Sequence, residues 1–311
     1  MKWIILLAAA VTLSAPAVTA QPADTALLFV HYKFSQVRDT TDRANPYKED
    51  MVLAVGRTAG VYRSYQRQLQ TAQTKRQIQE QASAGGPVRV NIHTTGTATE
   101  YFQFPNDHRL VREESLFGSF LITEPLPVIN WQISADTASF GSLLCQKATA
   151  HFKGRDYIAW FCPDLPLHVG PWELNGLPGV IVEAYDVKKE VQFLFDGVEK
   201  ATPTASANDQ AAGQPPVARG KMPPPLPGME DMNNDPNLIQ LPANATKTTD
   251  KEFARLQAAF RKDPDAFAQS MLAARNAAQP GDNGPKMKMN FKPGPHTEPV
   301  INNPIELPEK Q

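Results

Sequence analysis

The chain has few of the residues that mark the commonest special classes of protein. Only two of its 311 residues are cysteine, so a small scaffold held by many disulfides is excluded. Neither sign of charge dominates, since removing Lys2 with the leader described below leaves 30 basic and 32 acidic residues, a net charge of −2. This balance gives no electrostatic reason to expect nucleic acid or an anionic membrane as a partner.

Long apolar runs and familiar catalytic signatures are also missing. No stretch approaches the roughly 18 apolar residues of a membrane-spanning helix, so we expect a protein that does not span a membrane. The sequence has no Gly-x-Ser-x-Gly, no His-Glu-x-x-His, no Cys-x-x-Cys and no Gly-x-Gly-x-x-Gly after a strand. We therefore expect no cofactor, and the sequence favours a protein that is not an enzyme.

The N-terminus has the pattern of a secretory signal peptide. Lys2 supplies the early positive charge, and an apolar stretch follows from Trp3 to about Leu13. Small residues then lead to Ala20, which fits a cleavage site, and the apolar stretch is too short to span a membrane. We predict that residues 1–20 are removed and that the protein is exported, to the periplasm or the exterior.

Residues 21–200 read as mostly β. Apolar and polar residues alternate at 28–34, 129–133 and 190–195, as in strands with two different faces, and 51–65 resembles a hairpin. Short strands between Gly, Pro, Asn and Asp turns favour antiparallel connections. Residues 64–82 predict one surface helix. The predicted fold is mainly β (α+β), a twisted antiparallel sheet or partly open barrel with a few peripheral helices.

The composition changes after residue 200, since 17 of the 28 prolines lie in 201–311. Residues 201–248 are rich in Pro, Ala and Asn and poor in large apolar residues, which predicts a flexible segment. Residues 249–278 predict a helical pair, with a capping box at Thr249 and Glu252, then Asp263 as N-cap before Pro264. Residues 279–311 read as an extended tail, in which 286–291 could add an edge strand.

The two cysteines fit opposite positions of one hairpin. If Lys153 and Gly154 form the turn within 143–163, paired residue numbers sum to 307, and Cys145 and Cys162 meet this condition. Counting outward from the turn places them at a non-hydrogen-bonded pair, where Cα atoms lie about 4.5 Å apart, within disulfide range. An oxidising compartment favours the disulfide over two free buried thiols.

The stretch CQKATAHFKGRDYIAWFCPDLPLHVGPWELNGLPGVIVEAYD (145–186) resembles the signature block of the GLPGLI family. The naming motif here reads Gly176-Leu177-Pro178-Gly179-Val180-Ile181, with Val180 in place of the usual Leu. The closing NPIEL, Asn303 to Leu307, matches as well. The family consists of exported proteins found mainly in Bacteroidetes without an established biochemical function. The resemblance therefore implies export and supplies no reaction.

The motif itself supplies geometry. Gly176 and Gly179 permit positive φ or close backbone approach, and Pro178 fixes its own φ while pushing Leu177 into an extended conformation. The motif lacks the strand–loop–helix context and the Lys-Ser/Thr of a phosphate-binding loop. We interpret it as a tight corner that leads into a strand, in preference to a ligand-binding loop.

The preceding loop, 162–175, holds the best candidates for a binding site. An aromatic residue flanked by polar groups on a loop is typical of a recognition surface. The candidates are Asp164, His168, Trp172, Glu173 and Asn175. The favoured alternative is a long crossing loop whose Trp172 fills the core. Elsewhere, His151 should face Asp156 across the hairpin, which is more often a surface ion pair than a catalytic pair.

Methionines in the polar tail give a weaker metal hypothesis. Met287, Met289 and His296 would supply the soft thioether and imidazole ligands that suit Cu(I), but their spacing is irregular. The leading functional hypothesis is a non-catalytic, exported binding or envelope-associated protein whose partner is a hydrophobic ligand, a peptide or an envelope protein. The alternatives are a hydrolase or peptidase-like enzyme that uses the 162–175 loop, and a Cu(I)-binding protein.

Overall fold

The computed structural model describes residues 23–83, 96–116, 118–165, 167–202, 235–278 and 300–309. The predicted signal peptide, most of the predicted flexible segment and the possible strand at 286–291 lie outside these residues. The strands are β1 (Asp24–Thr25), β2 (Leu28–Gln36), β3 (Tyr47–Val55), β4 (Gly60–Ser64), β5 (Glu100–Phe104), β6 (Arg109–Ser115), β7 (Ser119–Pro125), β8 (Gln132–Phe140), β9 (Leu143–Phe152), β10 (Arg155–Cys162), β11 (Val180–Asp186), β12 (Val191–Lys200), β13 (Leu238–Ile239) and β14 (Thr246–Thr248). The helices are α1 (Tyr65–Ser83), the 3-10 turn η1 (Pro105–Asp107), α2 (Asp250–Lys262) and α3 (Pro264–Ala278).

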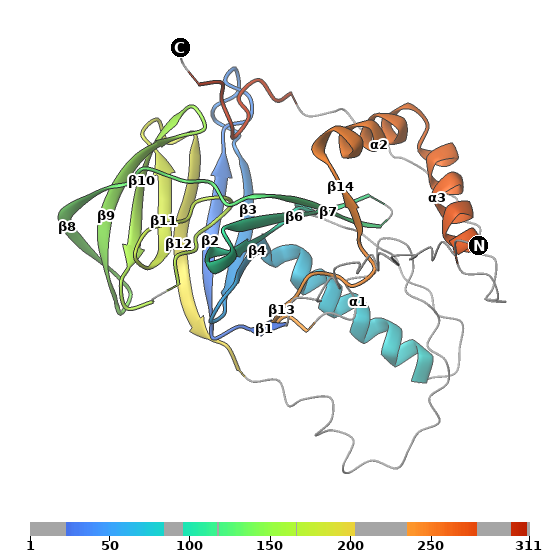
Figure 1. Ribbon diagram of the computed structural model, residues 1–311, viewed down its shortest axis with the longest axis horizontal. Coiled ribbons are helices and arrows are strands. Elements are labelled where there is room, and N and C mark those ends of the chain that lie inside the picture. Colours follow the sequence, from blue (N-terminus) through green and yellow to red (C-terminus); the bar gives the residue numbers. More distant parts are fainter. Residues whose placement is uncertain are drawn as a thin grey trace, which may run out of the picture.

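One large twisted sheet dominates the molecule (Figure 1). Its twelve strands run in the order β14-β7-β6-β5-β4-β3-β2-β12-β11-β10-β9-β8, and β1 pairs with β13 in a separate two-stranded sheet. Neighbouring strands are antiparallel except β14, which runs parallel to β7. The sheet does not close into a barrel, because β14 and β8 end it on either side. The mainly β prediction is thus confirmed.

The periodic patterns found in the sequence correspond closely to strands. In β2, Val30 and Tyr32 are buried and His31 between them is partly exposed, as alternation predicts. The pattern at 129–133 was a poorer guide, because β8 begins only at Gln132. Trp131 instead donates its indole N–H to the carbonyl oxygen of Asn175 at 2.8 Å, which ties this stretch to a loop.

The helices lie beside the half of the sheet that contains β4 to β7 (Figure 1). Thr249 and Glu252 form the predicted capping box of α2, and the Asp263 carboxylate accepts the N–H of Ala266 at the start of α3. Both predicted caps are thus confirmed. They were predictable because a helix cap depends only on residues close together in the chain. Among the described residues, no helix combines the length and the apolar character needed to cross a membrane.

The sheet has a hydrophobic cluster on each face. Along β3, Leu53 belongs to one cluster, whereas Val52 and Ala54 belong to the other, and alternate residues of a strand face opposite sides. Residues 163–179 cover the first cluster. The second cluster is partly covered by residues 235–245, of which Ile239 is buried. The end of the segment that was predicted to be flexible, 201–248, therefore packs on the sheet and contains the short strands β13 and β14.

Candidate functional site

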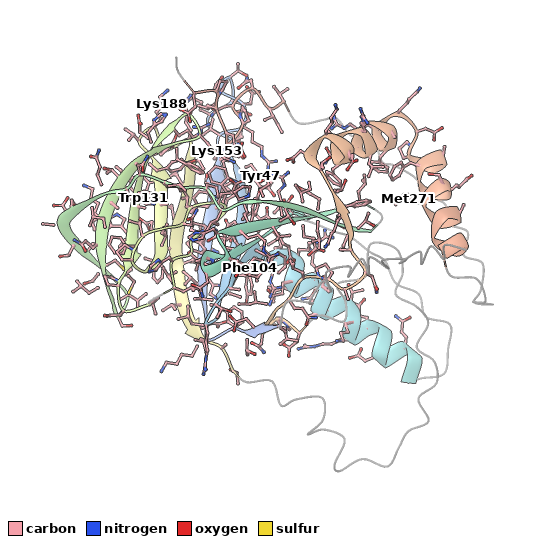
Figure 2. The ribbon with its side chains drawn as sticks, in the orientation of Figure 1. Tyr47, Phe104, Trp131, Lys153, Lys188 and Met271 are labelled. Carbon is pink, nitrogen blue, oxygen red and sulfur yellow. The ribbon has the colours of Figure 1, made fainter. Side chains whose placement is uncertain are left out.

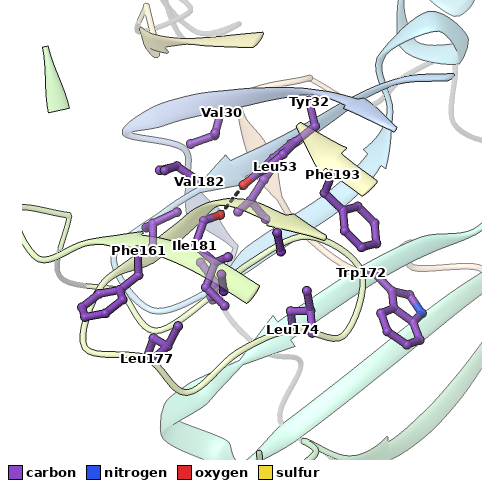
Figure 3. Packing of buried hydrophobic residues seen from close by; sticks show 14 of the residues in the cluster. Val30, Tyr32, Leu53, Phe161, Trp172, Leu174, Leu177, Ile181, Val182 and Phe193 are labelled. Atoms are coloured by element: carbon purple, nitrogen blue, oxygen red, sulfur yellow. Dashed lines mark hydrogen bonds between the residues drawn. The ribbon is translucent and has the colours of Figure 1, made fainter. Parts of the chain in front are cut away.

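The loop 163–179, between β10 and β11, lies against the sheet and fills its first cluster. Trp172, Leu174 and Leu177 are almost completely buried there (Figure 3). Trp172 stacks on Phe193 of β12, with ring centroids 6.5 Å apart and planes 12° from parallel. This is the arrangement that the crossing-loop interpretation describes, with Trp172 inside the core.

The Gly-Pro corner brings the loop back to the strand end. Gly179 has a φ of +152°, and an added Cβ atom would lie 2.1 Å from the carbonyl oxygen of Cys162. Its N–H donates to the Leu177 carbonyl oxygen at 2.7 Å, which closes a turn around Pro178. Only glycine fits this position. The motif thus makes a close backbone crossing that starts β11.

A buried glutamine fastens the loop, and the sequence analysis missed it. Gln103, in β5, is fully buried, and its side-chain amide donates to the carbonyl oxygens of Gly170 and Trp172 at 3.0 and 2.8 Å. Its side-chain oxygen accepts the Gly170 N–H at 3.2 Å. A single side chain therefore satisfies backbone groups that the irregular loop would otherwise leave unpaired. No sequence signal marks Gln103, since it occurs in an otherwise ordinary strand.

Asn175 also holds the loop in place. Its side-chain amide donates to the backbone carbonyl oxygens of Pro127 and Glu173 at 3.1 and 2.9 Å. The backbone carbonyl oxygen of Asn175 accepts the indole N–H of Trp131. The Asn175 side chain is 4% exposed in these bonds. Asn175 therefore connects two loops, and its amide does not face a binding surface.

Arg155 joins two segments that are far apart in the sequence, the β9–β10 hairpin and the C-terminal residues 303–305. This residue starts β10, is 4% exposed, and binds five partners at 2.7 to 3.2 Å. The partners are the carboxylates of Asp186 and Glu190, the side-chain oxygen of Asn303, and the carbonyl oxygens of Pro304 and Ile305. All three of its nitrogens donate, so the buried guanidinium is well satisfied.

The Asn303 side chain completes this cluster. Its amide nitrogen donates to the Val37 carbonyl oxygen at 2.8 Å and to Glu190 at 3.1 Å. Burial raises the pKa of Glu190, but hydrogen bonds from Arg43, Arg155 and Asn303 outweigh this and lower it overall. The NPIEL segment is therefore seated on the hairpin by buried, charge-assisted bonds.

The turn of the β9–β10 hairpin carries a second charged group. Lys153 lies 2.6 Å from the Glu173 carboxylate and 2.9 Å from that of Glu306. Gly154 follows with a φ of +72°, and an added Cβ would lie 2.5 Å from the Leu307 carbonyl oxygen, so the C-terminal segment passes directly over the turn. Figure 2 shows Lys153 toward the end of the sheet near which the C-terminal segment lies.

Electrostatics differ between the two members of the Lys153–Glu173 pair. Burial raises the pKa of Glu173, and Lys153 only partly offsets this effect. Burial lowers the pKa of Lys153, but hydrogen bonds to Glu173 and Glu306 raise it overall. The lysine therefore stays charged, and the glutamate is a carboxyl group held in an unusually apolar setting.

Three buried polar atoms near this pair have no hydrogen-bond partner within the described part of the chain. They are the hydroxyl of Tyr157, the indole N–H of Trp172 and the carboxylate oxygen Oε1 of Glu173. Buried polar atoms are nearly always hydrogen-bonded, so a group of unpartnered ones marks a place for a bound water or for a polar group of a ligand. We call these three residues together with Lys153 and Glu306 the Glu173 site.

The five loop candidates do not form one rim. Trp172, Glu173 and Asn175 are buried, whereas Asp164 and His168 are exposed. The reason is that Gln103 and the apolar cluster draw the middle of the loop into the interior. Trp172 and Glu173 thus remain site candidates, on the inside of the protein.

His151 faces Asp156 across the hairpin, as the register predicts. Its Nδ1 lies 2.6 Å from Asp156, and its Nε2 lies 2.8 Å from Glu309 of the C-terminal segment. Hydrogen bonds with Asp156 and then Glu309 raise the pKa of His151. The three side chains are largely exposed, so His151 and Asp156 form a surface ion pair that Glu309, far away in the sequence, joins as a third member.

The two cysteines lie where the hairpin register predicts. The ladder pairs Trp160 with Lys147 and continues to Phe161 and Gln146, one step before Cys162 and Cys145. Both are buried thiols in the structure. Burial is the main cause, and the neighbouring Cys162 the second, that raises the pKa of Cys145 to about 12. The disulfide between them stays a prediction.

Metal candidates have little structural support. Met287, Met289 and His296 lie outside the described residues, so the Cu(I) hypothesis stays untested. Among the residues that the structure does describe, no group of three or more His, Cys, Asp or Glu side chains could hold a metal ion.

A shallow hollow of about 550 Å³ lies over β2, β3 and β12. Lys33, one of its lining residues, already pairs with Asp50 at 2.9 Å and Asp196 at 3.1 Å. Lys33 and these two carboxylates therefore largely neutralise one another, and ion pairs at an exposed surface contribute little to stability. The Glu173 site, with its unpartnered buried atoms, is the stronger candidate.

No protein-family model matches the chain, and no curated protein matches its sequence. Two solved structures of PNGF-II are similar to parts of it. The structure in space group P21 is 9% identical, with a TM-score of 0.40, and the match covers 59% of this chain and 30% of the other. The structure in space group C2 is 8% identical, with a TM-score of 0.43, covering 73% and 32%. The chain thus spans about a third of the length of these proteins, and a likeness at this level carries no information on function.

Proposed function

We propose that this chain is an exported member of the GLPGLI family and a non-catalytic binding or envelope-associated protein. One observation carries the proposal. In the loop 163–179, the Asn175 side chain holds the fold together, whereas Trp172 and Glu173 each keep one buried polar atom that has no partner among the described residues. Such a site can recognise a partner by hydrogen bonds, and the surrounding frame fixes its shape.

The contacts of Arg155 support the family assignment. In the resemblance, the 145–186 block and the closing NPIEL are far apart in sequence, yet Arg155 binds Asn303, Pro304 and Ile305 directly. Two segments that contact each other through a buried charge have a physical reason to occur together. The signature then describes one folded unit, which supports a role of the motif in shape.

The test is retention of a partner from envelope material. Purified mature protein would be exposed to envelope extract and analysed by native mass spectrometry, beside the variant Glu173→Gln, whose circular dichroism verifies folding. We expect the unmodified chain to retain a lipid, peptide or protein that the variant retains less. Retention of nothing would contradict the proposal. Turnover abolished by Asp164→Ala, His168→Ala or Glu173→Ala in activity profiling would favour the hydrolase or peptidase alternative instead.

A further inference from the structure

The three residues that carry the unpartnered atoms of the Glu173 site lie in one cluster. The rings of Tyr157 and Trp172 are in contact, with centroids 6.4 Å apart, and Glu173 directly follows Trp172 in the chain. Lys153 connects them, because its ammonium lies 2.6 Å from Glu173 and 5.3 Å from the centre of the Trp172 ring. These contacts bring Tyr157, Trp172 and Glu173 together around the Lys153 side chain.

Their hydrogen-bonding capacity defines what that group must do. An indole N–H only donates, so Trp172 requires an acceptor. The Glu173 carboxylate oxygen accepts, so it requires a donor. The Tyr157 hydroxyl can do both. A ligand group that completes all three must both donate and accept hydrogen bonds.

The charges around these atoms disfavour an ionic ligand of either sign. A cation would meet the Lys153 ammonium and the positive end of the Trp172 N–H. An anion would meet the Glu173 carboxylate, with that of Glu306 also bound to Lys153. Because the site is buried, a like charge costs much more there than at the surface. A neutral group fits best.

The walls of the site are apolar, and one side reaches the surface. Trp172 packs on Phe152 at 5.6 Å and on Phe193 at 6.5 Å between ring centroids, so aromatic rings form one side of the site. Toward the hairpin turn, the side chains of Lys153 and Glu306 are 27% and 48% exposed. Hydrogen bonds formed beside such apolar rings are stronger than in water. Lys153 and Glu306 are the part of the site that is most exposed to solvent.

We propose that Tyr157, Trp172 and Glu173 bind a neutral hydroxyl or carboxamide group of the ligand. This inference rests on the proposed binding function and names the chemistry of its site. A carboxamide donates through its nitrogen to Glu173 and accepts through its oxygen from Trp172. A hydroxyl does the same with one proton and its lone pairs.

Three planar probes of nearly equal shape test the charge and the hydrogen bonding separately. They are acetamide, which is neutral, acetate, which is an anion, and acetamidinium, which is a cation. Each would be titrated into the mature chain while ¹H–¹⁵N spectra follow the indole N–H signals. Trp131→Phe and Trp160→Phe identify two of these signals, which assigns that of Trp172. The indole of Trp131, already bonded to Asn175, is the internal control.

We expect acetamide to shift the Trp172 signal saturably and to leave the Trp131 signal unchanged, with acetate and acetamidinium binding at least fivefold more weakly. Tyr157→Phe should weaken acetamide binding about fivefold, the effect of one lost hydrogen bond. The inference is overturned if a charged probe binds as well as acetamide, or if none of the three moves the signal. A partner retained from envelope extract together with either result would leave the proposed function standing.

Discussion

Two charged clusters lie at the turn end of the β9–β10 hairpin, one around Arg155 and one around Glu173, and they differ in one respect. Around Arg155, every guanidinium nitrogen has a partner, and Asn303 uses both ends of its amide. Around Glu173, the C-terminal segment also contributes a residue, Glu306, but three buried polar atoms have no partner among the residues that the structure describes. A fully satisfied network stabilises a fold, and a partly satisfied one has capacity left for a ligand. We therefore assign structure to the first cluster and binding to the second.

Arg155 should give the largest effect. Arg155→Met leaves Asp186 and Glu190 buried without their main counter-charge, so we expect a loss of about 3–5 kcal/mol in the free energy of unfolding. Denaturant unfolding measures it. The matched control is Arg43→Met, because Arg43 binds Glu190 from a side chain that is 52% exposed, and we expect about 1 kcal/mol or less. Equal effects of the two variants would contradict the special role of Arg155.

The cysteine pair would reinforce the same hairpin covalently. The predicted disulfide between Cys145 and Cys162 should contribute about 3 kcal/mol, since it closes a loop of intermediate length. Intact protein isolated under non-reducing conditions should be about 2 Da lighter than the reduced protein, from the two hydrogens lost in forming the bond. Labelling of both thiols in native, oxidised protein would show that the hairpin is held without a covalent link.

His151 should make the attachment of the C-terminal segment sensitive to pH. Its pKa is raised above the usual value of about 6.5 by Asp156 and Glu309. The stabilisation is therefore complete below about pH 6.5 and is lost as the pH rises through the raised pKa. At pH 6, the His151→Asn variant should unfold at a lower temperature than the unmodified chain. At pH 9, the difference between the two unfolding temperatures should be much smaller. In an Asp156→Asn, Glu309→Gln background, this difference should disappear, and its persistence would point to other groups.

Tyr157 should give the smallest effect on stability. Because its hydroxyl has no partner in the described part of the chain, Tyr157→Phe removes no protein hydrogen bond, and we expect a change within about 0.5 kcal/mol. Denaturant unfolding of the free protein provides the measurement. A loss above about 1 kcal/mol would mean that the hydroxyl is already bonded, which would remove it from the Glu173 site.

Local chemistry was predictable from the sequence. The turn at Lys153 and Gly154 fixes the register of β9 and β10, and Thr249 with Glu252 marks the start of α2. These features depend on residues close together in the chain, where turn and cap preferences act directly.

Contacts between distant segments were not predictable in the same way. Arg155 and Asn303 are 148 residues apart, and Gln103 reaches a loop 67 residues away. Such contacts leave no period or spacing in the sequence. Glu173 and Asn175 also looked like surface residues, because polar types are mostly exposed, and only the fold reveals the partners that make their burial possible. The burial of Trp172 was thus the favoured interpretation of the sequence, whereas the burial of Glu173 and Asn175 was not predicted.

The central claim is that Arg155 and Asn303 join the β9–β10 hairpin and the C-terminal segment into one unit. A double-mutant cycle with Arg155→Met, Asn303→Ala and the combined variant measures their coupling by denaturant unfolding. We predict a coupling free energy of about 1–3 kcal/mol, as for residues in one buried hydrogen-bonded network. Additive effects, agreeing within about 0.5 kcal/mol, would show that the two segments do not act together and would contradict the account.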